Sequence, residues 1–125
     1  MRSLHVFLVE NHEDTVRYMK LFLEQLSYKV RTAADMATAL REIPKWDCDV
    51  LISDIGLPDG DGWELMERLG KQRPQFAIAM SGYGTCNDQR RSRDAGYDHH
   101  LVKPFAPDAL LLLLQEAGKQ KEKQS

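Results

Sequence analysis

The sequence predicts an α/β domain in which a parallel sheet is covered by helices on both faces, a three-layer α/β/α arrangement. Two observations predict it. Apolar, strand-like runs alternate with segments of helical periodicity five times along the chain. The length of 125 residues, with 42% apolar and 29% charged residues, suits one compact domain with a single core.

The first half of the chain contains two strand–helix units. An apolar run at residues 4–9 is the first strand, and the segment 13–26 has the periodicity of an amphipathic helix. A shorter strand at 29–33 precedes a helix at 35–43, which Pro44 ends. The residues expected to face the core are Val16, Met19, Phe22, Leu23 and Leu26 in the first helix and Ala37 and Leu40 in the second.

The second half contains three further units. The expected elements are a central strand at 49–53, a helix at 61–71, strands at 76–80 and 98–102, a polar helix at 85–95 and a final helix at 107–118. Gly96 is a suitable stop for the polar helix, and Pro107 a suitable first residue for the last one. We expect one domain over residues 1–118 and a disordered tail at 119–125.

Composition excludes several classes of protein. A formal net charge of -2 argues against direct nucleic-acid binding, which normally needs a basic surface. Cys48 and Cys86 lie far apart without CxxC spacing, so neither a zinc site nor a disulfide framework is indicated and a reducing cytoplasm is the natural setting. No apolar stretch approaches the ~20 residues that span a bilayer, and the N-terminus lacks signal-peptide segments, so no membrane association is expected.

Four polar residues follow or end different predicted strands. Asp54 ends the run Val50–Leu51–Ile52–Ser53 and precedes the turn-forming string GLPDGDG, while Glu10, Ser81 and Lys103 occupy the corresponding positions of three other strands. In a parallel sheet these positions converge on one edge, where α/β proteins bind ligands. Asp54 alone would be read as a turn residue. Its convergence with a hydroxyl and an ammonium favours phosphoryl chemistry on a carboxylate.

Several motifs together resemble a known family. They are LISDIGLPDGDG, the pair Ser81–Gly82, AGYDHHLVKPF and the acidic residue after the first strand. Over residues 4–118 the sequence resembles the receiver domains of bacterial two-component response regulators. The strings LVENHEDT, SGYG and AGYDHHLVKP look most like receivers of hybrid sensor histidine kinases. The resemblance implies a flavodoxin-like fold with strand order 2-1-3-4-5.

The resemblance also implies a function. Asp54 would accept a phosphoryl group from a histidine kinase or phosphotransfer protein and so change a protein-interaction surface. The domain would not be an enzyme in its own right, although it would assist its own phosphorylation and dephosphorylation. Lys103 and Ser81 would bind phosphoryl oxygens, the Lys103–Pro104 bond would be cis, and Ser81 would act with His100 as a switch.

Charge repulsion between a carboxylate and a phosphoryl group calls for a cation, and Mg2+ prefers oxygen ligands. By analogy with the family, Asp54, Asn11 and the carbonyl of Gly56 would bind Mg2+ directly, and Glu10 would act through water. Asn11 departs from the family, which normally has an acidic residue there. Two readings stay open: a receiver with weakened Mg2+ binding, and a degenerate receiver that serves as a phosphorylation-independent interaction module. A flavodoxin-like small-molecule binder is a distant third, because no glycine-rich phosphate loop follows the first strand.

The final helix carries five consecutive leucines, Leu110 to Leu114. At 100° per residue they wrap the whole helix, whereas a helix lying on a sheet needs one apolar face. Neighbouring side chains could cover this surface. We favour a role in homodimer formation or partner binding, together with the adjoining strand and the arginine-bearing helix before it.

Overall fold

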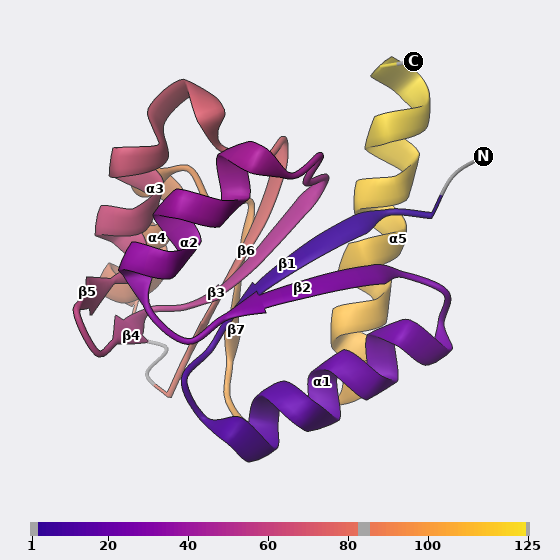
Figure 1. Ribbon diagram of the computed structural model, residues 1–125, viewed down its shortest axis with the longest axis horizontal. Helices are drawn as coiled ribbons and strands as arrows, with labels where there is room; N and C mark the ends of the chain where they lie inside the picture. The colour runs from indigo at the N-terminus through magenta and orange to yellow at the C-terminus, as the bar shows by residue number, and fades with distance from the viewer. Residues whose placement is uncertain (1–2, 83–85, 125) are drawn as a thin grey trace.

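The computed structural model describes residues 3–82 and 86–124, with side chains as far as Lys121. Its centre is a five-stranded parallel sheet of order β2-β1-β3-β6-β7 (Figure 1). The strands are β1 His5–Val9, β2 Lys29–Ala33, β3 Val50–Asp54, β6 Phe76–Ser81 and β7 His99–Val102. Counted among these strands alone, the order is 2-1-3-4-5, which confirms the expected topology.

Helices cover both faces of the sheet (Figure 1). On one side lie α1 (Glu13–Gln25) and α5 (Pro107–Gln124). On the other side lie α2 (Met36–Glu42), α3 (Gly62–Leu69) and α4 (Cys86–Ala95). Two short 3-10 turns, Ile43–Lys45 and Gly70–Gln72, follow α2 and α3. The three-layer α/β/α architecture is thereby confirmed.

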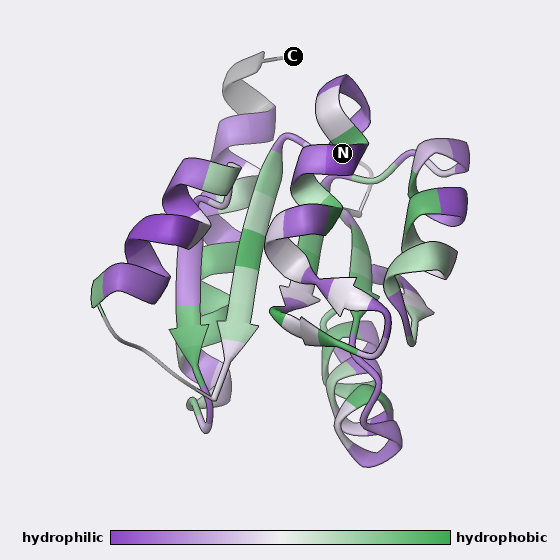
Figure 2. Cartoon of the chain, turned by 90° about the vertical axis from the view of Figure 1, so that its left-hand side faces the viewer, coloured by the Kyte–Doolittle hydropathy of each residue, from purple (hydrophilic) through white to green (hydrophobic). Residues whose placement is uncertain are grey.

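The sheet separates two hydrophobic cores. Successive side chains of a strand point to opposite faces, so Phe7 and Val9 pack beneath α2 and α3 while Val6 and Leu8 pack against α1 and α5. Strands β1, β3 and β6 are buried almost throughout, as expected for strands covered on both faces. Figure 2 shows hydrophobic residues on the strands and many hydrophilic residues on the helices around them.

Two helix faces differ from expectation. Leu26 does not face the core, because α1 ends at Gln25 and Leu26 is its C-cap, 39% exposed. Ala37 is exposed, and the buried residues of α2 and the turn after it are instead Met36, Ala39 and Ile43. The cause is the helix start: the Asp35 carboxylate accepts a hydrogen bond from the Thr38 amide (2.7 Å), which sets the phase of the first turn.

The last helix continues further than expected. α5 runs to Gln124, so residues 119–124 are helical where a disordered tail was expected. The extension is in contact with the rest of the domain, because the Lys121 ammonium pairs with the Asp49 carboxylate beside β3. Ala117, just before the extension, is buried in the core. Within the described ranges, no helix is both long and apolar enough to cross a membrane.

A two-stranded antiparallel ladder, β4 (Gly56–Leu57) with β5 (Gly60–Asp61), fills the turn after β3 and was not anticipated. The Asp59 carboxylate in its loop accepts hydrogen bonds from the backbone amides of Met36 (2.7 Å) and Ala37 (2.9 Å). These bonds satisfy amides at the start of α2 that have no partner within the helix. The turn that carries Gly56 is therefore fastened to a neighbouring helix.

Candidate functional site

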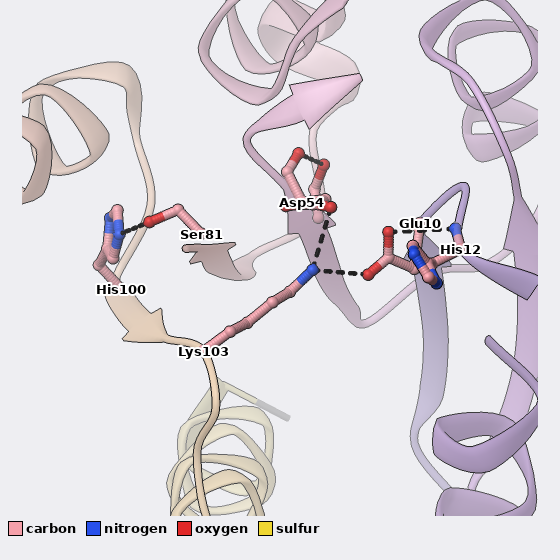
Figure 3. A network of polar contacts seen from close by, with 7 residues as sticks. Glu10, His12, Asp54, Ser81, His100 and Lys103 are labelled. Carbon is pink, nitrogen blue, oxygen red and sulfur yellow. Dashed lines mark hydrogen bonds and ion pairs between the residues drawn. The ribbon is translucent and has the colours of Figure 1, made fainter. Parts of the chain in front are cut away.

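The strand ends bring the four expected polar residues to one edge of the sheet (Figure 3). Val9 pairs with Ser53, so the residue after β1, Glu10, emerges beside Asp54. Ser81 pairs with Val102, and the Lys103 amide donates to the Ser81 carbonyl (2.7 Å). The sequence argument therefore identified this meeting point correctly.

The Lys103 ammonium joins the two carboxylates. Its Nζ lies 2.7 Å from Glu10 Oε1 and 3.1 Å from Asp54 Oδ2 (Figure 3). The Glu10 side chain is 1% exposed and that of Asp54 14% exposed. Buried carboxylates are costly unless paired, so this ammonium is the group that keeps them at the same edge.

The two carboxyl groups have opposite pKa shifts. Burial, together with the hydrogen bond and the negative charge of Glu10, raises the pKa of Asp54 from 3.8 to about 6, although Lys103 acts against this rise. Burial also opposes ionisation of Glu10, but hydrogen bonds with Lys103 and Asp54 outweigh it and lower the pKa of Glu10. Burial lowers the pKa of Lys103, but the two carboxylates raise it by more, so the net change is a rise. The site thus favours a charged lysine, an ionised Glu10 and a readily protonated Asp54.

The turn after β3 holds Asp54 by close backbone packing. A Cβ added at Gly62 would lie 2.9 Å from the Asp54 carbonyl oxygen and 3.1 Å from the Tyr97 hydroxyl, so only glycine allows this approach. The buried Tyr97 hydroxyl donates to the Gly62 carbonyl (2.7 Å). The last glycine of GLPDGDG is therefore a packing requirement of the site.

Asn11 and Gly56 lie at the solvent-facing rim of this edge. Asn11 is exposed directly after the buried Glu10, and a Cβ added at Gly56 would meet nothing within 4 Å, so there is open space beside the turn. Across residues 3–82 and 86–124, no group of three or more His, Cys, Asp or Glu side chains is placed to hold a metal ion. The local donors are hard oxygen atoms, and they fit a divalent cation such as Mg2+ held by few protein ligands.

Ser81 faces away from Asp54. Its Oγ lies 2.7 Å from His100 Nε2, and Figure 3 shows the hydroxyl directed toward the imidazole. The expected pair of Ser81 and His100 is therefore in direct contact. The expected cis peptide bond between Lys103 and Pro104 is present.

Two residues of this network were missed in the sequence. Ser92 of α4 is 1% exposed; its Oγ lies 2.8 Å from His100 Nδ1 and accepts a hydrogen bond from Trp63 Nε1 (2.9 Å). Its helix was expected to be polar and solvated, and the expected start at residue 85 lies outside the described residues. One signal was available: Ser92 and Ala95 are the small residues at i and i+3 among charged ones, which is the spacing of an inward face.

The fold and the site define a CheY-like α/β domain. A profile of the response regulator receiver domain matches residues 6–115. The chain therefore belongs to the response regulator receiver family, as the motifs had indicated.

Individual relatives agree with this family. The transcriptional regulatory protein KdpE of Mycobacterium tuberculosis is 31% identical over 112 residues, which cover 90% of this chain and 50% of KdpE. The chain thus spans about half the length of that regulator. The crystal structure of a CheY-like receiver domain protein from Methanospirillum hungatei JF-1 superposes with a TM-score of 0.91 at 30% identity, covering 98% of this chain and 99% of that one. The sensor protein EvgS of Escherichia coli O157:H7 is 28% identical over 109 residues, which cover 86% of this chain and 9% of EvgS; it lends loose support to the hybrid-kinase likeness.

The raised pKa of Asp54 predicts a pH-dependent stability. A carboxyl group with a pKa raised from 3.8 to about 6 stabilises the fold below its unfolded pKa, and this contribution is lost as pH rises through about 6. Asp54→Asn should therefore raise the free energy of unfolding of the metal-free protein near pH ~7.5, by on the order of 2 kcal/mol, and change it little near pH ~4. Urea titrations with a chelator check this, and Asp14→Asn at the exposed start of α1 serves as control. An equal effect of Asp54→Asn at both pH values would contradict the assignment.

Proposed function

We propose that this domain is a phosphoacceptor of a two-component phosphorelay, in which Asp54 takes a phosphoryl group from a histidine kinase or phosphotransfer protein. The observation that carries the proposal is the contact of Lys103 with both Glu10 and Asp54 at a sheet edge that also holds Ser81. Membership of the receiver family supports it. The domain acts in signalling, and its catalytic contribution is confined to its own phosphorylation and dephosphorylation.

The proposed transfer exchanges one bond to phosphorus for another. An Asp54 oxygen forms a bond to phosphorus while the bond from phosphorus to the donor's histidine nitrogen breaks, and the electron pair stays on that nitrogen. Lys103 pairs with Asp54 before transfer and offers its charge to a phosphoryl oxygen afterwards. Glu10, Asn11, Asp54 and the Gly56 carbonyl would hold Mg2+, which neutralises charge on the phosphoryl oxygens when bound. Ser81, turned toward Asp54, donates a hydrogen bond to another phosphoryl oxygen.

The alternative is a degenerate receiver that acts by binding alone. Asn11 supplies an amide oxygen without charge, and Lys103 already balances one of the two buried carboxylates. Both features weaken the attraction for a cation. A protein that binds its partner equally well with and without phosphorylation would have this function.

The phosphoacceptor assignment predicts one modified residue. After incubation with Mg2+ and acetyl phosphate, the protein should gain about 80 Da, the mass of one phosphoryl group, in an acid-labile form on its nucleophile. Asp54→Asn should abolish this adduct, while Asp59→Asn in the neighbouring turn should keep it. Mass spectrometry of the intact protein decides, and an adduct that persists in Asp54→Asn would overturn the assignment.

The metal assignment predicts a gain from restoring an acidic residue. Asn11→Asp should tighten Mg2+ binding roughly tenfold or more, since even residues that merely support metal ligands are worth about 10- to 100-fold. The same change should lower the stability of the metal-free protein, because a third carboxylate joins two others. A Mg2+ titration followed by NMR measures the affinity. Asn11→Ala is the matched variant, because it removes the side-chain oxygen and should weaken binding. Equal affinity in all three proteins would mean that residue 11 is not a ligand.

A surface on α5 is the proposed site of self-association or partner binding. The leucine run is less exposed than its sequence implied: Leu110 (2%) and Leu114 (0%) are buried, and Leu113 packs against the same core. Leu112 is 66% exposed, and Val102 at the end of β7 is 38% exposed. Exposed leucines are individually ordinary. The face that includes Leu112 is nevertheless a common dimerisation and output surface in receivers. Phosphorylation of Asp54 would act through Ser81 and His100 to increase the fraction of molecules in which this face is in its binding conformation.

The proposed surface on α5 predicts that phosphorylation changes the oligomeric state of the protein. Beryllofluoride, a phosphoryl mimic, should promote dimer formation in a light-scattering concentration series, and Leu112→Gln should weaken that dimer by removing apolar contact area. Leu21→Gln is the matched control, because Leu21 is 57% exposed on α1. A monomer at all concentrations with the mimic bound would rule out the dimer.

The wider setting is also a proposal. The free cysteines Cys48 and Cys86 are compatible with the reducing cytoplasm expected from the sequence. The net charge of -2 argues against direct contact with nucleic acid. The KdpE relative, about half of whose length this chain spans, is a transcriptional regulatory protein.

A further inference from the structure

A chain of hydrogen bonds runs from the site to α3. Trp63 Nε1 donates to Ser92 Oγ (2.9 Å), and Ser92 Oγ lies 2.8 Å from His100 Nδ1. The other imidazole nitrogen, Nε2, lies 2.7 Å from Ser81 Oγ. The chain thus connects α3, α4, β7 and β6 in four consecutive side chains.

The donors and acceptors give this chain a direction. An indole nitrogen is only a donor, so Ser92 Oγ is the acceptor of the first bond. Among the described residues, the Ser92 side chain has two partners, Trp63 and His100. Its single hydroxyl hydrogen has no other acceptor among the described residues, so the arrangement that uses this hydrogen is donation from Ser92 Oγ to His100 Nδ1 without a hydrogen of its own. The imidazole then carries its hydrogen on Nε2 and donates it to Ser81 Oγ.

Burial makes these hydrogen bonds costly to break. Ser92 is 1% and Ser81 5% exposed, so water is poorly placed to replace a lost partner. A buried polar group that loses its partner keeps the full cost of desolvation. The chain also holds Ser81 in the orientation turned away from Asp54 (Figure 3).

We propose that Ser92 and Trp63 are positioning residues that fix the tautomer of His100 and, through it, latch Ser81 away from Asp54. The proposal rests on the proposed phosphoacceptor function, because a phosphoryl group on Asp54 recruits the Ser81 hydroxyl only after its bond to His100 breaks. The latch therefore opposes the phosphorylated state. The other end of the hydrogen-bond chain is Trp63 on α3, so release of Ser81 would change the contacts of this side chain. There Arg91 Cζ lies 4.0 Å from the centre of the Trp63 ring, beside a cleft between α3 and α4.

The first test needs no phosphoryl group. In protein labelled with 15N-histidine, NMR distinguishes the two neutral imidazole tautomers. We expect His100 to carry its hydrogen on Nε2 in the unmodified protein, and to lose this single tautomer in Ser92→Ala and in Trp63→Phe. Ser92→Thr retains a hydroxyl and should keep it, and Arg91→Met, which removes only the stacked cation, should also keep it. Hydrogen on Nδ1 in the unmodified protein would overturn the chain's direction and the latch with it.

The second test measures the latch through affinity for beryllofluoride in the presence of Mg2+. Losing one buried hydrogen bond should favour the rotated Ser81, so Ser92→Ala and Trp63→Phe should bind the mimic several-fold more tightly. Arg91→Met and Ser92→Thr should bind as the unmodified protein does. Unchanged or weaker binding by both Ser92→Ala and Trp63→Phe would refute the latch. If the unmodified protein binds no beryllofluoride, the proposed phosphoacceptor function fails. The latch then has no phosphorylation to control, even if His100 has the expected tautomer.

Discussion

The ammonium of Lys103 is the interaction on which the rest of the site depends. Glu10 and Asp54 are both largely buried, and without a cation beside them their mutual repulsion would disfavour the state in which both are ionised. Lys103 reaches them because β7 pairs with β6 and its own amide bonds to the Ser81 carbonyl. An accepted phosphoryl group would bring more negative charge to the same ammonium, so one cation serves both the empty and the occupied site.

Strand ends and their convergence were predictable from the sequence for a physical reason. Strands β1, β3 and β6 are buried on both faces, so each must be an unbroken apolar run, and such a run ends where a polar residue enters solvent or a site. Asp54, Glu10 and Ser81 mark those ends directly. Parallel pairing then leaves a single edge on which they meet.

Features that depend on tertiary contacts were less predictable. Met36, and not its neighbour Ala37, faces the core. Which of the two is buried depends on the Asp35 cap and on the hydrogen bond from the Met36 amide to Asp59 in another turn. The segment 119–124 reads as a polar tail, yet it continues α5 past the pairing of Lys121 with Asp49, a residue 72 positions earlier. Neither Ser92 nor Trp63 belongs to a motif, and the spacing of Ser92 and Ala95 indicates an inward face of the helix but not its partners. Their roles follow only from the packing of α3 and α4 over β7.

The division of the domain into two cores has a consequence for assembly. The exposed side chain of Leu112 belongs to the layer of α1 and α5, whereas Trp63 and the cleft beside it belong to the layer of α3 and α4, with the sheet in between (Figure 1). A protein seated on one layer leaves the other accessible. A partner that contacts only the α1 and α5 layer and a second protein at the cleft between α3 and α4 can therefore occupy the same molecule at once without competing for one surface.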